Sequence, residues 1–181
     1  MLNNIYLIEQ LCFFLKNEIR NYRISEIFSQ EKDKLIITLI SSDNKCIKNL
    51  EFSAIKNLNF LLLKNEFSKA KKNFANLFGE INNKEILKVE LYNNDRIISL
   101  SLDDGLNILI VLIPAKANIL LIKNGIVQNS FKNKDELLHK CVENLFSRNI
   151  ISESKNAKTS LEYIKHTSPE LGKLLIIEIF F

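Results

Sequence analysis

Glycine and proline are scarce in this chain, whose 181 residues include 4 Gly, 2 Pro and no Trp. This composition excludes collagen-like, low-complexity and loop-dominated proteins. The three cysteines, Cys12, Cys46 and Cys141, lie far apart, which excludes the close pairs of a zinc site and the framework of a small disulfide-rich domain. Each lies within an apolar pattern, so we expect buried free thiols in a reducing compartment.

A strong excess of one charge is also lacking. The chain has 25 Lys and Arg against 21 Asp and Glu, a net charge of +4 and a pI of about 8.9. This balance permits a nucleic-acid partner without requiring one. The longest apolar run, residues 106–117, is interrupted by polar residues and is too short to span a bilayer, and residues 1–10 lack a basic leader. We therefore expect a cytoplasmic protein with no membrane partner.

The apolar pattern predicts one amphipathic helix, over residues 4–20, followed by short strands separated by polar turns. The same order of elements then begins again, with a helix over residues 67–78 that closes at Gly79. The expected strands are residues 22–30, 34–41, 46–52 and 59–64 in the first series, and 84–92, 96–101, 106–113 and 118–123 in the second.

The two series also match in sequence. At an offset of 62 residues, 33–36 (DKLI) falls on 95–98 (DRII), and at an offset of 59, residues 59–65 (NFLLLKN) fall on 118–124 (NILLIKN). The sequence therefore predicts an α+β fold, in which two duplicated helix-plus-β-hairpin units form a two-lobed, β-rich domain over residues 1–131, sheet against sheet with a helix at each end.

After this domain we expect a helical extension over residues 132–181. Ser168 and Pro169 are typical of a helix start, and we interpret the extension as the beginning of a helix-hairpin-helix segment. Because the last residues are apolar and would leave a helix face uncovered, we expect the natural protein to continue. The expected elements here are a turn at residues 124–125, a strand at 126–131, a helix at 134–148 and a polar linker at 152–160.

No catalytic motif is present. The sequence has no G-x-G-x-x-G, P-loop, H-E-x-x-H or G-x-S-x-G pattern. The two histidines, His139 and His166, lie on different predicted helices with no cysteine or carboxylate at ligand spacing. We therefore expect no enzyme activity, no catalytic residue, no metal site and no cofactor.

Two groups of residues are candidates for binding. Asp95 and Arg96 lie at a predicted hairpin turn, where Asp either stabilises the turn with Arg as a solvated neighbour, or offers an acceptor beside a planar donor fork for phosphate, ribose or base edges. Lys69, Lys71 and Lys72 lie on the second predicted helix, either as a solvated surface or as phosphate contacts. Both alternatives stay open for each group.

The run 94–98 (NDRII), the strand 108–113 and the run 118–122 (NILLI), in this order, resemble the N-terminal domain of the NFACT family. This family includes bacterial RqcH, eukaryotic NEMF and proteins known as fibronectin-binding protein A. The resemblance covers about residues 5–125. Asp95 and Arg96 match the family's Asp-Arg pair.

The resemblance implies a domain that binds tRNA on the large ribosomal subunit during ribosome quality control of stalled nascent chains, without binding DNA. Asp95, Arg96, Lys69, Lys71 and Lys72 are then the expected RNA-binding residues. Members that add tails carry an acidic residue near the N-terminus, where this chain has Asn3 and Asn4, so tail addition stays open. The alternative is a protein-binding or adhesion module, like fibronectin-binding proteins, without an RNA role.

The expected fold also resembles the N-terminal part of formamidopyrimidine-type DNA glycosylases. Those enzymes use a Pro-Glu pair directly after the initiator Met, where this chain has Leu2 and Asn3. The resemblance therefore does not extend to glycosylase chemistry.

Overall fold

The computed structural model describes residues 4–56 and 58–146. The chain divides into two compact units, residues 1–142 and residues 143–181, and the fold described below is that of the first unit. The elements are α1 (Ile5–Ile19), β1 (Arg23–Glu31), β2 (Lys34–Ile40), β3 (Ile47–Ile55), β4 (Leu58–Lys64), β5 (Ala75–Asn76), η1 (Gly79–Ile81), β6 (Ile86–Leu91), β7 (Ile97–Leu102), η2 (Asp103–Gly105), β8 (Leu106–Val111), η3 (Pro114–Lys116), β9 (Asn118–Lys123), β10 (Ile126–Ser130), α2 (Lys134–Leu137) and α3 (Val142–Phe146).

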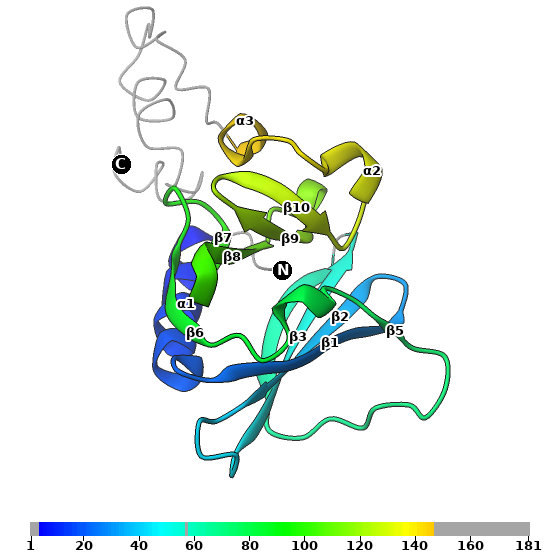
Figure 1. Cartoon of the computed structure of the whole chain (residues 1–181). Coiled ribbons are helices and arrows are strands. Elements are labelled where there is room, and N and C mark those ends of the chain that lie inside the picture. The colour runs from blue at the N-terminus through cyan, green and yellow to red at the C-terminus, as the bar shows by residue number, and fades with distance from the viewer. Residues whose placement is uncertain (1–3, 57, 147–181) are drawn as a thin grey trace, which may run out of the picture. The chain divides into compact units, whose positions relative to one another are not determined.

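Two antiparallel sheets of five strands form the unit (Figure 1). The strand order is β4-β3-β2-β1-β5 in the first sheet and β10-β9-β8-β7-β6 in the second. One core cluster contains side chains from both sheets and from α1, so the two sheets and the helix share a single hydrophobic interior. The predicted α+β class is confirmed, and the predicted domain over residues 1–131 lies within the first compact unit.

The helix α1 forms where the apolar spacing predicts it. The side chain of Asn4 caps its first turn by accepting a hydrogen bond of 2.9 Å from the Tyr6 amide. One face of the helix is buried in the core, and the chain leaves the helix before Asn21, whose φ of 66° is left-handed. Of the three cysteines, Cys12 is buried on this helix, but Cys46 is exposed and Cys141 half-buried, so the expected burial is wrong for Cys46.

The two sheets are built from equivalent four-stranded meanders, β1 to β4 and β6 to β9. Nine core residues of the first meander have core counterparts in the second, with an offset of 62 between β1 and β6, 63 between β2 and β7, and 58 for the last two strands. The pairs are Ile24 and Ile86, Ile27 and Val89, Leu35 and Ile98, Ile37 and Leu100, Leu39 and Leu102, Leu50 and Ile108, Phe52 and Ile110, Ala54 and Leu112, and Leu61 and Ile119.

These offsets correct the sequence alignment by one residue. The matches at 62 and 59 placed Leu35 on Ile97 and Leu61 on Leu120, but the structure pairs Leu35 with Ile98 and Leu61 with Ile119. Because side chains alternate between the faces of a strand, a shift of one residue exchanges the core face for the outer face. The duplication is therefore present, in a register that short identical runs of sequence did not reveal.

The meanders meet where β1 and β6 begin, and this joint is itself symmetric. Asn21 and Asn83, 62 residues apart, have φ values of 66° and 65°. Four backbone hydrogen bonds of 2.7–2.9 Å join the two segments in matched pairs: the Ile24 amide to Lys84 O and the Ile86 amide to Tyr22 O, then the Asn83 amide to Ile24 O and the Asn21 amide to Ile86 O. The two meanders are thus related by a local twofold axis through the joint.

The helix expected over residues 67–78 is not formed. Asn73 and Phe78 have left-handed φ values of 61° and 52°, which interrupt a right-handed helix. Gly79, expected to cap the helix in the left-handed region, has an ordinary φ and begins η1. At an offset of 62, Ile81 at the end of η1 corresponds to Ile19 at the end of α1, and both side chains are fully buried. One short turn therefore takes the place of the helix in the second half of the duplication.

Residues 65–74 instead form what we call the crossing segment. The strands that it connects, β4 and β5, lie at opposite edges of the first sheet, and Figure 1 shows the segment as a long loop without helix. Phe67 and Phe74 pack edge-on against Phe28, with ring centroids 5.8 Å and 6.3 Å away, and the Ala70 amide donates to Gln30 Oε1. The crossing segment therefore covers part of the sheet face that is turned away from the core.

The helix expected over residues 134–148 is divided. It is interrupted at His139, whose φ is 64°, and at Cys141, which forms an isolated bridge with Ile126. The amide of His139 donates to Val127 O, so this stretch follows β10 instead of continuing α2. The predicted linker over residues 152–160 and the helix start at Ser168 lie outside the described residues, and the helix-hairpin-helix interpretation stays a prediction.

Candidate functional site

Asp95 and Arg96 occupy the turn between β6 and β7, as the sequence predicts. The Asp95 carboxylate accepts a hydrogen bond of 2.7 Å from the Arg96 amide, and its Oδ1 lies 3.6 Å from Arg96 Nε. The turn is closed by the Asp95 amide, which donates to Tyr92 O, and the Ile97 amide, which donates to Asp95 O. The pair is partly buried. Asp95 therefore shapes the turn and also orients the guanidinium of Arg96.

The structural counterpart of Arg96 is Asp33. Arg96 O accepts the Leu112 amide and Asp33 O accepts the Ala54 amide, both at 2.8 Å, so the two residues hold the same place in the two hairpins. Asp33 and Asp95 are at equivalent turns but differ by one position. The counterparts Asp33 and Arg96 therefore carry opposite charges. Lys132 Nζ lies 2.6 Å from Asp33 Oδ1, and its hydrogen bond holds the pKa of the Asp33 carboxyl below its usual value.

Lys69 is engaged within the protein. Its ammonium lies 2.5 Å from Glu26 Oε2, 4.3 Å from the centre of the Phe28 ring and 4.1 Å from that of Phe74. A cation held by a carboxylate and two aromatic faces anchors the crossing segment to β1. Phosphate binding by Lys69 would require breaking this arrangement.

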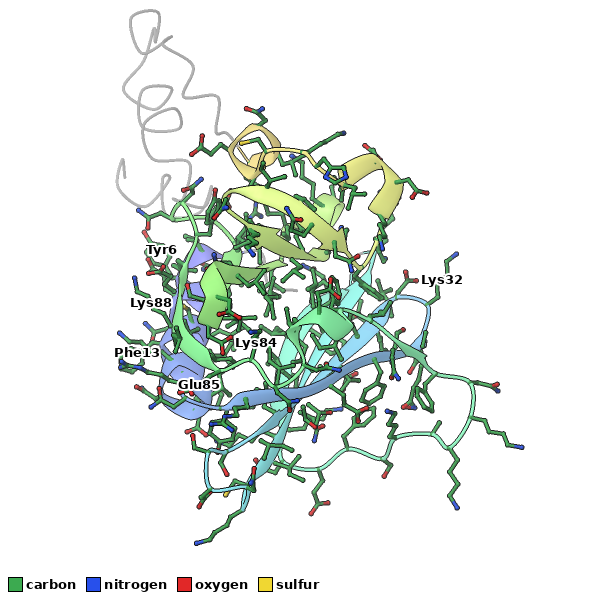
Figure 2. All side chains as sticks on the ribbon, in the orientation of Figure 1. Tyr6, Phe13, Lys32, Lys84, Glu85 and Lys88 are labelled. Carbon is green, nitrogen blue, oxygen red and sulfur yellow. The ribbon has the colours of Figure 1, made fainter. Side chains whose placement is uncertain are left out.

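Lys71 and Lys72 lie on the same crossing segment and are exposed. Because the expected helix is not formed, they are loop residues of the first sheet, whereas Asp95 and Arg96 belong to a hairpin of the second sheet. The predicted RNA-binding residues therefore form two positions on the molecule and not a single cluster. Figure 2 shows another lysine, Lys32, at the tip of the turn between β1 and β2.

Two polar contacts between the halves, one buried and one partly buried, were not anticipated from the sequence. Asn59, only 2% exposed, donates from Nδ2 to Leu112 O at 2.6 Å, and Lys132 donates from Nζ to Ala54 O at 3.0 Å. Leu112 and Ala54 are counterparts, so each half holds the other at the same place. The recurring Asn-initiated runs at residues 59 and 118 were the one available signal, but they do not occupy equivalent positions.

The outer face of α1 carries four exposed apolar side chains among polar ones. Tyr6, Leu7, Phe13 and Phe14 are 43%, 54%, 65% and 47% exposed, in two pairs spaced seven residues apart, which places them on one side of the helix. In Figure 2, Tyr6 and Phe13 point away from the sheets. The apolar spacing predicts the buried face of this helix, whereas nothing in the sequence indicated a role for the opposite face.

The edge strand β4 is a second apolar surface. Leu58 and Leu62, on its outer face, are 58% and 48% exposed. The sequence predicted this strand from its apolar run but gave no indication that it lies at an edge. Exposed apolar side chains on an unpaired edge are typical of surfaces that bind another protein chain.

Sites for metal or acid–base chemistry do not emerge from the described part of the chain. Residues 4–56 and 58–146 contain no group of three His, Cys, Asp or Glu side chains placed to hold a metal ion. Burial raises the pKa of the Cys12 thiol, as does the nearby Glu90 carboxylate, so this thiol is held in its protonated, less nucleophilic form.

Among the helices that the structure describes, none has the length and apolar character needed to cross a membrane.

Comparisons with known proteins give structural relatives alone. No protein-family model matches the chain, and no curated protein does. The N-terminal domain of the fibronectin-binding protein PavA from Streptococcus pneumoniae superposes with a TM-score of 0.66 and 16% identity, over 97% of this chain and 77% of that domain.

Two further solved structures are similar. They are the N-terminal part of the fibronectin/fibrinogen-binding protein from Streptococcus suis, with a TM-score of 0.58 and 17% identity over 71% of this chain, and the fibrinogen-binding protein from Staphylococcus aureus, with 0.59 and 14% over 73%. The matches span 52% and 51% of those two chains. At these identities the similarity establishes the fold, which is that of the N-terminal domain of PavA-like fibronectin-binding proteins.

Proposed function

We propose that this chain is a non-catalytic binding domain and that its partner is a protein. The four exposed apolar side chains on α1 carry the proposal. Four large apolar side chains exposed on one face of a helix would be costly for a surface with no partner, whereas the same residues supply the anchors of a protein interface. The cations that sequence analysis assigned to RNA give less support, because Lys69 is held by Glu26 and two aromatic rings.

The structural relatives support the same class of partner. All three are described as binding fibronectin or fibrinogen, so these two proteins are the first partners to test. A sheet-based domain with exposed apolar surfaces fits recognition of a protein ligand.

The test is binding of the full chain to immobilised fibronectin and to immobilised fibrinogen. We expect saturable binding to at least one of them, which Phe13→Glu weakens because a carboxylate then enters an apolar contact. The matched control is Ile126→Glu, which changes an exposed apolar residue on β10 instead of α1. If neither protein binds, or if both variants weaken binding equally, the proposal is wrong.

A second candidate is binding of tRNA on the large ribosomal subunit, as in ribosome quality control by the NFACT family. One observation favours it: Asp95 and Arg96, which match the family's pair, lie together in an ordered turn with the guanidinium oriented by the carboxylate. A cytoplasmic location belongs to this candidate. Lys71 and Lys72 add exposed positive charge on the other sheet.

Arg96→Ala, Arg96→Lys and Lys34→Ala test this candidate in a tRNA-binding titration. We expect weak binding that falls as salt rises, because phosphate contacts release counterions. Arg96→Ala should abolish it and Arg96→Lys should restore it only in part, since Lys lacks the planar fork. Lys34, which is paired with Glu31 at 2.9 Å beside the equivalent turn, is the control. Equal losses for Arg96→Ala and Lys34→Ala would exclude a specific role for Arg96.

A further inference from the structure

The edges of the two sheets differ in how they are protected. The free edges of regular sheets attract other strands, and proteins usually block them with bulges, very short strands or covering elements. In the first sheet, β5 has only 2 residues; in the second, β6 and β10 each contain a register shift, and α1 packs beside β6. Within residues 4–56 and 58–146, none of these protections is found at the remaining edge strand, β4. It pairs with β3 from Leu58 to Lys64 without any shift.

The backbone of β4 offers hydrogen-bonding groups along this edge. The amide and carbonyl of one residue point to the same side of a strand, and successive residues alternate. The Ala54 amide bonds β2, so in β3 the neighbouring Ser53 faces β4, and its partner Phe60 faces β3. It follows that Leu61 and Leu63 direct their amides and carbonyls away from β3, toward the open edge, whereas Asn59 at the start of the strand is covered and only 2% exposed.

The side chains along this edge do not block it. Leu58 and Leu62 present an exposed apolar outer face. The one charged residue within β4, Lys64, which would otherwise repel an approaching strand, forms an ion pair with Glu51. The edge is therefore regular and apolar, and the charge of its one lysine is balanced by Glu51.

The duplication shows what such an edge accommodates. The counterpart of β4 is β9, and the same edge of β9 is covered by β10, which runs antiparallel to it. There the Phe131 amide donates to Ile119 O at 2.9 Å, and Ile119 is the counterpart of Leu61. One half of the molecule thus contains a strand in a position that the described residues leave unoccupied in the other half.

We propose that the open edge of β4 binds an extended segment of a protein partner, which adds to the first sheet as an antiparallel strand in the position that β10 takes on β9. This inference rests on the proposed protein-binding function and adds a second binding surface to the one on α1. The partner segment carries apolar side chains at alternate positions, to lie beside Leu58 and Leu62. An acidic residue at one end complements the exposed Lys56, and the net charge of +4 disfavours a second copy of this chain as the occupant.

The experiment uses the full chain and a labelled synthetic peptide of alternating valine and threonine flanked by glutamates. Binding is followed by fluorescence anisotropy, and amide hydrogen exchange is measured with and without peptide. We expect saturable binding, with new protection at the amides of Leu61 and Leu63 and little change at Phe60 and Leu62, which already bond β3.

Leu62→Lys should weaken peptide binding by about tenfold or more, because an apolar neighbour of the incoming strand is lost and a charge is added. Leu87→Lys is the matched control, since Leu87 on β6 is also 48% exposed but lies on the other sheet. A scrambled peptide with a central proline should not bind. Thermal melts of both variants check that the fold is intact.

The outcomes separate this inference from the proposed function. Peptide binding lost in Leu62→Lys but not in Leu87→Lys supports the β4 site, whether or not fibronectin or fibrinogen binds. Peptide binding that Leu62→Lys leaves unchanged, together with binding of fibronectin or fibrinogen, would keep the proposed function and overturn the β4 site. Absence of peptide binding, protection elsewhere in the chain, or a dimer in sedimentation that Leu62→Lys dissociates would also overturn it.

Discussion

The two halves of this domain have the same interior and different borders. Each four-stranded meander contributes the same set of core positions, and each begins at a left-handed asparagine in the symmetric joint. Around this shared interior, the first half has a full helix and an open edge at β4, whereas the second has one short turn and the edge strand β10. Close packing explains why the core positions of the two copies are the same, whereas the helix and the edge strand, which lie outside the shared core, differ between them. The binding surfaces proposed above are all at the periphery.

The largest expected effect tests the equivalence of the two cores. Ile24 and Ile86 are counterparts, both are fully buried, and each takes part in the joint through its backbone. Ile24→Ala and Ile86→Ala should each lower the free energy of unfolding by about 2–5 kcal/mol, because each leaves a cavity at the same place in its sheet. Chemical denaturation measures both. A loss confined to one of the two variants would contradict the equivalence.

The next effect tests the matched turns before β1 and β6. Asn21 and Asn83 adopt left-handed φ angles, which a side chain with a Cβ and no local hydrogen-bonding group tolerates poorly. Asn21→Ala and Asn83→Ala should each lower the free energy of unfolding, measured by chemical denaturation, by about 1–2 kcal/mol, whereas Asn21→Gly and Asn83→Gly should leave it nearly unchanged. If alanine and glycine behave alike at either position, the backbone there is not held in the left-handed region.

Much of this fold could be predicted from the sequence, because the strands and α1 follow the periodicity of apolar residues. The register of the duplication could not. The identical Asp at residues 33 and 95 favoured an offset of 62 through the whole hairpin, but the second turn is one residue longer, so the strands that follow are shifted. The helix expected at residues 67–78 failed because packing of Phe67 and Phe74 on Phe28 overrides the local preference of an Ala- and Lys-rich run.

The binding surfaces were less predictable than the fold. The turn at Asp95 and Arg96 was located correctly, since turn residues act locally. The role of Lys69 was missed because Glu26 and Phe28, which hold it, are distant in sequence. The exposure of Leu58 and Leu62 depends on β4 being the last strand of its sheet, which is a property of the topology and leaves no mark on the strand's own sequence.

A smaller effect tests the crossing segment, which has no counterpart in the second half. Lys69→Ala removes an ion pair and contacts to two aromatic rings. It should therefore lower the free energy of unfolding by about 1 kcal/mol and raise the rate at which residues 65–74 are cleaved by a protease. Lys71→Ala, an exposed neighbour on the same segment, is the control and should change neither quantity. Equal susceptibility of both variants would show that Lys69 does not anchor the segment.

The smallest effect concerns Asp33, the counterpart of Arg96. Its pKa is lowered from 3.8 by the hydrogen bond from Lys132. A lowered carboxyl pKa stabilises the fold above pH 3.8, and this contribution is lost as the pH falls through the folded-state pKa. At neutral pH, Lys132→Met should therefore have a lower melting temperature than the unmodified chain. The difference between the two melting temperatures should become smaller in strong acid, where the Asp33 carboxyl is protonated in both proteins. A gap that is independent of pH would assign the loss to packing or to the Ala54 contact alone.

The two equivalent meanders differ by one covered edge, at β9, and one open edge, at β4. Amide hydrogen exchange in the free chain measures this difference. The amides of Leu61 and Leu63 on β4 should exchange much faster than those of their counterparts Ile119 and Leu121 on β9. Phe60 and Leu62, which face β3, should be protected, so that protection alternates along β4. Strong protection of Leu61 and Leu63 in the free chain would contradict the account, because it would show that the edge of β4 is already covered.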